Sequence, residues 1–259
     1  MKILAIMGSP RKEGNTFLVT KMIEERLKQF DHNIQFNYLF LRDADIKMCL
    51  GCTSCFNKGE AHCPLKDDTL KIAENMIQSD GVIFACPTYV ANVSGIMKNF
   101  IDRLAYICHR PLFYNKKALL VSTTGIAGLF QLFSSLSLAV SAWGFHITSK
   151  VGIVMGTNSI HSIPEKYFKQ IDKAVAKFYK AVIESEKYSP SITSLTAFQY
   201  NQNYYRNNDE STLDAKFWRE KGWLEVGKNY YVEARVNILK KIVARLITKI
   251  LEINIAKDK

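Results

Sequence analysis

The chain has 259 residues, and its 47% hydrophobic and 12% aromatic content is enough for a packed core and excludes a disordered protein. Four of its six cysteines crowd into one segment, which excludes a secreted disulfide framework and favours a reducing, cytoplasmic environment. We expect no signal peptide and no membrane span. The net charge of +11 does not indicate nucleic-acid binding, because the cations are scattered and no nucleic-acid motif accompanies them.

Residues 1–186 alternate between short apolar runs and segments with helical periodicity. The predicted strands cover residues 2–7, 34–41, 81–86, 118–122 and a part of 145–155. The predicted helices cover 16–30, 70–78, a segment that Ser94 caps, 129–143 and a segment from Pro164 to about 186. Five strands alternating with helices predict an α/β protein, with a parallel sheet covered on both faces.

The composition changes after Pro190, where aromatic and polar residues dominate. We therefore divide the chain into a domain of residues 1–186 and a C-terminal helical extension of residues 187–259. A basic amphipathic helix is expected at about 231–253. Such a helix can lie on a membrane, but it more often packs on its own domain or on a partner subunit. We expect a homo-oligomer, either a dimer or a tetramer, and no membrane contact.

The run Cys49-x2-Cys52-x2-Cys55-x7-Cys63, followed by Pro64, is the most specific chemical pattern in the chain. Thiols at this spacing can converge on one inorganic centre, and ferredoxins use a related run for iron–sulfur clusters. Three interpretations stay open. The run holds a [4Fe–4S] cluster, it holds zinc, or it holds no metal. The first is preferred, because structural zinc sites more often pair two C-x-x-C halves across a longer spacer.

Three loops follow predicted strands and carry groups suited to a phosphorylated heterocycle. The segment from Gly8 to Thr16 offers glycines, hydroxyls, Arg11 and the start of a helix, where backbone N–H groups favour a phosphate. The second loop contains Tyr89, which could stack on a planar ring, and the third has the small polar sequence Thr123-Thr124-Gly125. In open parallel sheets, ligands bind at the carboxyl ends of the strands, so the three loops are expected to form one site.

The motifs Gly8-Ser-Pro-Arg-x-x-Gly-Asn-Thr16, Pro87-Thr-Tyr89 and Val93-Ser-Gly-x-Met-Lys-x-Phe-Ile-Asp-Arg103 resemble those of the NADPH-dependent FMN reductase family. With the cysteine run, the chain is most similar to the iron–sulfur flavoproteins within it. The resemblance covers about residues 1–186. It implies a flavodoxin-like three-layer sandwich with a five-stranded parallel sheet of order 2-1-3-4-5. Two departures are a shorter glycine run after the fourth strand and the C-terminal extension.

The resemblance also implies the residues that bind FMN and the metal. Those expected to hold the FMN phosphate are Ser9, Arg11, Asn15 and Thr16. Those expected to border the isoalloxazine ring are Pro87, Thr88, Tyr89 and Asn92, with Thr123, Thr124 and Gly125 on its other side. The expected metal ligands are Cys49, Cys52, Cys55 and Cys63. Because a flavin carries the chemistry itself, we assign no catalytic side chain, and interpret Asp102, Arg103 and His146 as packing or surface positions.

The predicted function is an FMN-dependent NAD(P)H oxidoreductase. Its electron donor is expected to be NAD(P)H or a ferredoxin-like protein, and a [4Fe–4S] cluster could pass electrons on to a small-molecule or protein acceptor. The alternatives are a non-catalytic electron carrier with the same fold and FMN, and a zinc-stabilised binding module without flavin.

Overall fold

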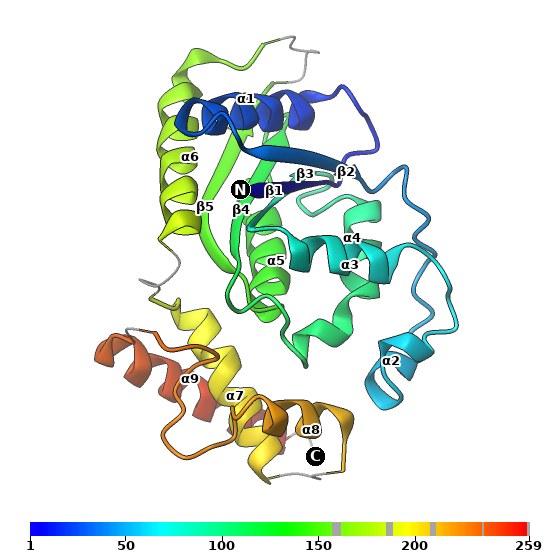
Figure 1. Ribbon diagram of the computed structural model, residues 1–259, viewed down its shortest axis with the longest axis vertical. Helices are drawn as coiled ribbons and strands as arrows, with labels where there is room; N and C mark the ends of the chain where they lie inside the picture. Colours follow the sequence, from blue (N-terminus) through cyan, green and yellow to red (C-terminus); the bar gives the residue numbers. More distant parts are fainter. Residues whose placement is uncertain (157–161, 185–188, 208–210, 235, 258–259) are drawn as a thin grey trace.

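A five-stranded parallel sheet forms the centre of the protein, as a computed structural model shows (Figure 1). The structure describes residues 1–156, 162–184, 189–207, 211–234 and 236–257. The strands are β1 (Lys2–Met7), β2 (Gln35–Phe40), β3 (Gly81–Pro87), β4 (Lys117–Thr124) and β5 (His146–Val154). Their order in the sheet is β2-β1-β3-β4-β5, and every neighbouring pair is parallel. The predicted fold class and strand order are therefore confirmed.

Helices cover both faces of the sheet, because successive side chains of a strand point to opposite sides. On one face, Ile3 and Ala5 of β1 pack with apolar residues of α1 (Asn15–Phe30) and α6 (Phe168–Ile183). The opposite face packs against α3 (Thr69–Gln78), α4 (Gly95–Arg103) and α5 (Leu129–Ala142). Figure 1 shows α1 and α6 on one side of the strands and α3, α4 and α5 on the other.

The predicted boundaries in the first 184 residues lie close to the observed ones. The observed bounds of β1 and the last residue of α1 match the predicted ones. Ser94 caps α4, as predicted, because its side chain accepts a hydrogen bond from Met97 N. Pro164 precedes a 3-10 turn, Glu165–Tyr167, before α6 begins at Phe168. Between β2 and α3 the structure adds two short elements that the sequence analysis did not predict, α2 (Ser54–Asn57) and a 3-10 turn at Glu60–His62. Another 3-10 turn, Ala105–Cys108, follows α4.

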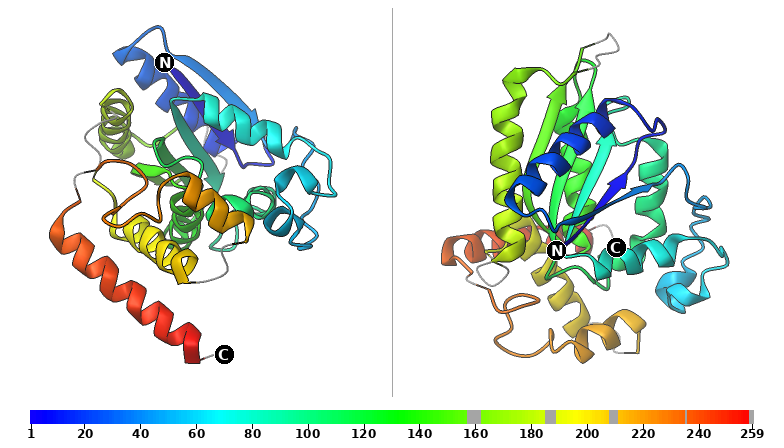
Figure 2. Two further views of the ribbon diagram at one scale, coloured as in Figure 1. Left: turned by 60° about the horizontal axis from the view of Figure 1, so that its bottom comes forward. Right: turned by 45° about the horizontal axis from the view of Figure 1, so that its top comes forward.

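The C-terminal extension contains α7 (Ile192–Asn207), α8 (Leu213–Glu220) and α9 (Ile238–Lys257), which gather beyond one end of the sheet (Figure 2). Its aromatic side chains form a separate buried cluster around Phe198, Trp218, Trp223 and Tyr231. The expected domain boundary at 186/187 lies outside the described residues, so the division into two domains stays a prediction.

The start that we predicted for the last helix, near residue 231, is wrong. Tyr231 is buried in the aromatic cluster, 4.7 Å from the ring of Trp223, and α9 begins only at Ile238. α9 rests on α7 through the small side chains of Ala244 and Thr248. Its large aliphatic residues are exposed along the whole described length, for example Ile238 (74%) near its start and Ile253 (54%) near its end. The extension therefore does not bury the apolar stripe of this helix.

Candidate functional site

The loops after β1, β3 and β4 meet in one small cavity of about 70 Å³, the three-loop cavity. Ten of the eleven residues that we predicted for the FMN site line it, together with Gly14. These ten are Ser9, Arg11, Asn15, Thr16, Pro87, Thr88, Tyr89, Thr123, Thr124 and Gly125. They come together because the carboxyl ends of β1, β3 and β4 lie side by side in the sheet.

The N-terminus of α1 opens onto the three-loop cavity. Gly14 occupies the N-cap position, where it has no side chain to accept a hydrogen bond from the first turn. The first backbone bond of the helix runs from Leu18 N to Gly14 O, so the N–H groups of Asn15 and Thr16 have no acceptor within the helix. Free N–H groups and the positive end of the helix dipole favour an anion here.

Hydroxyl groups connect the three loops to one another. Thr16 Oγ1 lies 2.7 Å from Thr123 Oγ1, which joins α1 to the end of β4. Thr88 N donates to the carbonyl of Thr123 at 2.8 Å, and Thr88 Oγ1 lies 2.9 Å from Ser122 Oγ. These contacts fix the relative positions of the loops before any ligand binds.

The Tyr89–Asn92 segment is a tight turn in which both central residues have left-handed backbone angles. φ is +48° at Val90 and +58° at Ala91, a conformation that is costly for a β-branched residue and clusters at ligand sites. Paired backbone hydrogen bonds between Tyr89 and Asn92 hold the turn. Asn92 does not line the three-loop cavity, and its Oδ1 accepts a hydrogen bond from Val93 N. The turn leaves the Tyr89 side chain 38% exposed at the cavity.

Two neighbouring contacts were not foreseen from the sequence. Arg42, just after β2, donates to the carbonyl of Pro10 at 2.5 Å, and Lys12 forms a 2.8 Å ion pair with Asp43. These contacts support the loop after β1. Arg11 lines the cavity, whereas Lys12 does not and is paired with Asp43.

The four cysteines of the run line a second and larger cavity of about 470 Å³, the cysteine cavity. Cys49 and Cys52 are exposed, whereas Cys55 and Cys63 are partly buried. Among the described residues, no three cysteine, histidine or carboxylate side chains lie close enough together to enclose a metal ion. The chain therefore brings the four thiols to one cavity without closing them around a common point.

The thiols differ in acidity. Hydrogen bonds from Ser54 lower the pKa of Cys52, whereas burial raises the pKa of Cys55. Cys86 is fully buried in the core beneath α4, where burial raises its pKa to about 11. Cys86 is therefore a core residue, as the sequence analysis inferred.

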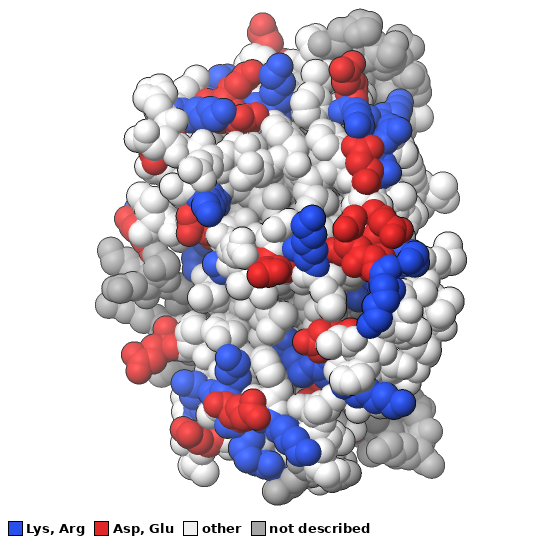
Figure 3. Space-filling model, turned by 45° about the vertical axis from the view of Figure 1, so that its right-hand side comes forward, with Lys and Arg blue, Asp and Glu red and all other residues white. Residues whose placement is uncertain are grey.

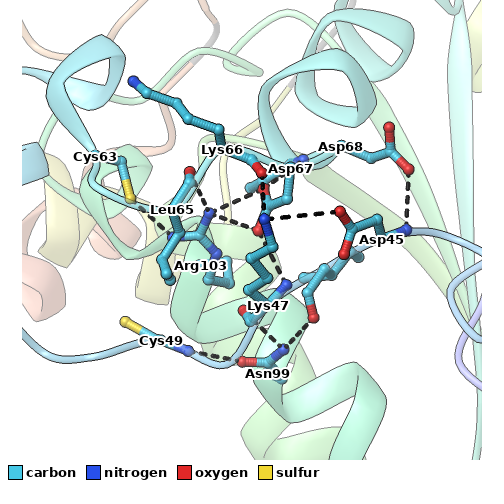
Figure 4. A network of polar contacts seen from close by, with 12 residues as sticks. Asp45, Lys47, Cys49, Cys63, Leu65, Lys66, Asp67, Asp68, Asn99 and Arg103 are labelled. Carbon is cyan, nitrogen blue, oxygen red and sulfur yellow. Dashed lines mark hydrogen bonds and ion pairs between the residues drawn. The ribbon is translucent and has the colours of Figure 1, made fainter.

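Arg103, at the end of α4, lies beside the cysteine run (Figure 4). It is only 8% exposed, and its Nη1 donates to Cys63 Sγ at 3.0 Å. Its Nη2 makes two 2.9 Å hydrogen bonds to the carboxylate of Asp67. Burial opposes the charge of Arg103, but the contacts with Cys63 and Asp67 outweigh it and raise the pKa of the guanidinium. Interpreting Arg103 as a packing or surface position missed this contact, since sequence spacing does not reveal which loop crosses a helix end.

The start of the cysteine run is also fixed by α4. Asn99 Oδ1 accepts a hydrogen bond from Cys49 N at 3.1 Å, and Asn99 Nδ2 donates to the carbonyls of Ile46 and Lys47 (Figure 4). Asn99 and Arg103 stand four residues apart and so share one face of the helix. One face of α4 thereby holds both ends of the cysteine run.

The middle of the run is held by Arg110, which in turn pairs with the C-terminal extension. Arg110, 6% exposed, donates to the carbonyl of Cys55 at 2.7 Å and to Glu60 at 3.0 Å. The same guanidinium pairs with Asp214 of α8, which also accepts a 2.9 Å contact from His109. Burial would raise the pKa of Asp214, but the contacts with His109 and Arg110 outweigh it and lower the pKa.

The two cavities share no lining residue, and α4 connects the cysteine cavity, which its last two residues line, with the loop after β1. At its start, Ser94 Oγ donates to the carbonyl of Gly8 in the loop after β1, and at its end lies Arg103. At 1.5 Å per residue these ends are about 13 Å apart.

On the face drawn in Figure 3, which includes this side of the molecule, acidic and basic side chains are interspersed. In the described part of the chain, no helix has the length and hydropathy to cross a bilayer.

The comparisons with known proteins agree with this geometry. The family model described as NADPH-dependent FMN reductase matches residues 1–159. An iron–sulfur flavoprotein from Archaeoglobus fulgidus is 34% identical over 203 residues, which cover 72% of this chain and 98% of that protein. Another from Clostridioides difficile is 31% identical and covers 76% of this chain and 86% of its own length.

Solved structures share the fold. An NADH:FMN oxidoreductase covers 70% of this chain and 89% of its own, with a TM-score of 0.53 and 19% identity. The match to the azoreductase AzrA covers 70% of this chain and 99% of that protein, with a TM-score of 0.52 and 14% identity. The chain therefore belongs to the NADPH-dependent FMN reductase family and is an FMN-dependent oxidoreductase of flavodoxin-like fold.

Proposed function

We propose that FMN binds with its phosphate at the N-terminus of α1, held by Ser9, Arg11, Asn15 and Thr16. The uncapped first turn and the cationic Arg11 support this placement. A cavity of about 70 Å³ suits a phosphoryl group and leaves the flavin ring to lie outside it, across the neighbouring loops.

The isoalloxazine ring is proposed to lie against Pro87, Thr88, Tyr89 and Asn92 on one side. Thr123, Thr124 and Gly125 border its other side. Tyr89 has the exposed aromatic surface that a planar heterocycle needs, and Asn92 lies across the same turn. The hydroxyls of Thr88 and Thr123 are already engaged with neighbouring loops, so these residues contribute mainly by fixing the shape of the site.

Bound FMN supplies the transfer of two electrons, or of one electron at a time, and the protein residues orient it and limit the access of water. NAD(P)H or a ferredoxin-like protein is the proposed electron donor, and a small molecule or a redox protein is the proposed acceptor. The observation that carries this function is the meeting of the three loops in one cavity beside an uncapped helix.

We further propose that Cys49, Cys52, Cys55 and Cys63 hold a [4Fe–4S] cluster, which supplies transfer of single electrons. The donor set fits such a group, because four thiols line one cavity against a buried arginine. Gly51 and Gly59, with φ of +63° and +97°, lie within the run and allow the turns by which its backbone brings the thiols to one cavity. Thiols of this kind also favour a reducing compartment, so we propose a cytoplasmic location.

Anaerobic purification followed by assays of flavin, iron, sulfide and zinc tests both proposals. We expect one FMN per chain, together with iron and sulfide in equal amounts. Flavin without iron would support the proposed FMN site and contradict the proposed cluster. A colourless protein with stoichiometric zinc would contradict both proposals. Steady-state NAD(P)H oxidation with a dye acceptor separates the enzyme from a non-catalytic electron carrier, because the carrier would turn over only with a protein partner.

Arg11→Ala tests the FMN site directly. Loss of a charge-assisted contact to phosphate is expected to weaken FMN binding by about 10-fold or more, since such contacts contribute about 1.5–3 kcal/mol. Lys12→Ala is the matched control, because Asp43 already offsets its charge. Equal loss in the two variants would contradict the assignment of the phosphate to Arg11.

We also propose that the exposed face of α9 pairs with a second copy of the chain. Leu239, Ile242, Leu246, Ile250 and Ile253 follow one another at intervals of three or four residues, the spacing by which two helices pack together. All five are exposed, opposite the side that rests on α7. Light scattering of Leu246→Glu should show a monomer if the wild-type protein is a dimer or tetramer. A monomeric wild-type protein would refute this interface.

A further inference from the structure

The side chain of Arg103 extends from the end of α4 to a cysteine of the run. It is 8% exposed, and Nη1 lies 3.0 Å from Cys63 Sγ, within hydrogen-bonding range for a sulfur acceptor. A second bond from Nη2 to the carbonyl of Leu65, at 3.4 Å, fixes the guanidinium between Cys63 and the following segment. The arginine is therefore held rigidly beside one proposed metal ligand.

The same guanidinium has an unused donor. Arg103 Nε is fully buried and has no hydrogen-bond partner among the described residues. Buried donors nearly always have an acceptor, because an unpaired buried N–H is costly. Arg103 lines the cysteine cavity, so a sulfur of a group bound there is an acceptor that could complete the arrangement.

The charge of Arg103 is balanced by Asp67, whose side chain is 1% exposed and accepts two 2.9 Å hydrogen bonds from Nη2. Asp67 is in turn fixed by the backbone N–H groups of Lys47 and Thr69. The cavity thus carries a directional donor without a large net charge.

We propose that Arg103 is a positioning residue for the metal centre, donating hydrogen bonds to Cys63 Sγ and to a sulfur of the centre, and thereby makes the centre easier to reduce. The inference rests on the proposed [4Fe–4S] cluster. Reduction adds one electron, which FMN reduced by NAD(P)H would supply, and breaks no bond. The added electron makes the sulfurs more negative, so an N–H donor stabilises the reduced state more than the oxidised state. Hydrogen bonds to the sulfurs are among the factors that set cluster potentials.

An anaerobic redox titration followed by electron paramagnetic resonance tests this role in the full-length protein. Arg103→Met removes the donors and should shift the midpoint potential to a more negative value. Because Arg103→Met leaves Asp67 buried without a partner and could destabilise the fold, the double variant Arg103→Met/Asp67→Asn removes both charges together. It should shift the potential in the same direction as the single variant.

Asp67→Asn alone provides the opposite change. It keeps the donors of Arg103 but removes the compensating carboxylate, so the potential should become more positive. Lys98→Met is the control, because it removes a cation from the same helix at a position where the side chain is 56% exposed and paired with Asp102. Its potential should match that of the wild-type protein. Arg103→Lys, which keeps the charge but not the planar fork, should fall between the wild type and Arg103→Met.

Iron and sulfide assays on each sample separate the two proposals. A wild-type protein that binds no iron would overturn the cluster and, with it, the role of Arg103. Iron in all samples, with an unchanged potential in the double variant, would overturn the role of Arg103 alone. Loss of iron from both Arg103→Met variants, with a loaded wild type, would assign Arg103 a structural role and also overturn the proposal.

Discussion

Asp214 of α8 pairs with Arg110, whose guanidinium also binds the backbone carbonyl of Cys55. The pair joins the C-terminal extension to the cysteine run, which lies more than 150 positions earlier in the sequence. Trp218 strengthens the same junction, since its Nε1 donates to the carbonyl of His109 at 2.7 Å. The extension therefore supports the cysteine cavity, whereas none of the residues that line the three-loop cavity belongs to it.

The first prediction concerns this junction. Asp214→Asn should lower the free energy of unfolding by about 3–5 kcal/mol, because it leaves the buried Arg110 without its principal counter-ion. Denaturant unfolding measures the change. Asp102→Asn is the control, since Asp102 pairs with Lys98 at an exposed site, where an ion pair contributes about 1 kcal/mol or less. Equal losses in the two variants would show that the Asp214 contact is not a buried one in solution.

Sequence patterns predicted the sheet and the three-loop cavity because both depend on local signals. The apolar run of β1 and the cap at Ser94 can be read directly, and the order of the strands then brings their loops together. Long-range polar contacts leave no such signal. The pairings of Arg103 with Cys63 and of Arg110 with Asp214 depend on how the cysteine run folds back over α4.

The extension was the least predictable part for a related reason. α7 buries polar residues such as Ser194, Gln199 and Gln202 together with apolar ones, so it shows no clear apolar stripe. Tyr231 was predicted to begin the last helix, but it is buried with Tyr230 in an aromatic cluster that draws its members from separate segments. Such a cluster has no periodicity that a single sequence could reveal.

The second prediction concerns the start of α4. Ser94 Oγ accepts a hydrogen bond from Met97 N and donates one to the carbonyl of Gly8, at the edge of the loop that follows β1. Ser94→Ala should destabilise the protein by about 1–2 kcal/mol and also weaken FMN binding, because that loop loses its anchor.

Thr212→Ala is the matched control for Ser94→Ala. Thr212 caps α8 in the same way, by accepting a hydrogen bond from Ala215 N, but it lies in the extension. Thr212→Ala should destabilise the protein by a similar amount and leave the FMN dissociation constant unchanged, as measured by flavin fluorescence. Weakened FMN binding in both variants would attribute the effect to general destabilisation.

The third prediction concerns Gly128, at the end of the loop after β4. Its φ is +94°, and an added Cβ would lie 2.7 Å from Ala91 Cα and 2.9 Å from Thr88 Cγ2. Gly128→Ala should therefore push apart two of the loops that form the three-loop cavity and strongly reduce FMN binding. Gly227→Ala is the control, because φ is +87° there and nothing lies within 4 Å of the added atom. FMN bound equally well by both variants would mean that the loops tolerate separation.

The fourth prediction concerns pH. Burial, together with the charges of Lys117, Lys177 and Lys240, lowers the pKa of His146 from 6.5 to about 3. Between these values the unfolded chain binds a proton that the folded protein does not, so stability should fall as the pH decreases from about 6.5 towards 3. Asp67 and Asp214 act in the same direction below about pH 4, because their pKa values are lowered in the folded protein.

His146→Gln separates the histidine from the carboxylates. Glutamine does not titrate, so the variant should lose the fall in stability between about pH 6.5 and pH 4 and keep the fall at lower pH, as denaturant unfolding at a series of pH values would measure. His32→Gln, at an exposed position, should keep the wild-type profile. If the His146→Gln profile matched that of the wild type above pH 4, the lowered pKa of the partly buried His146 at the start of β5 would be refuted.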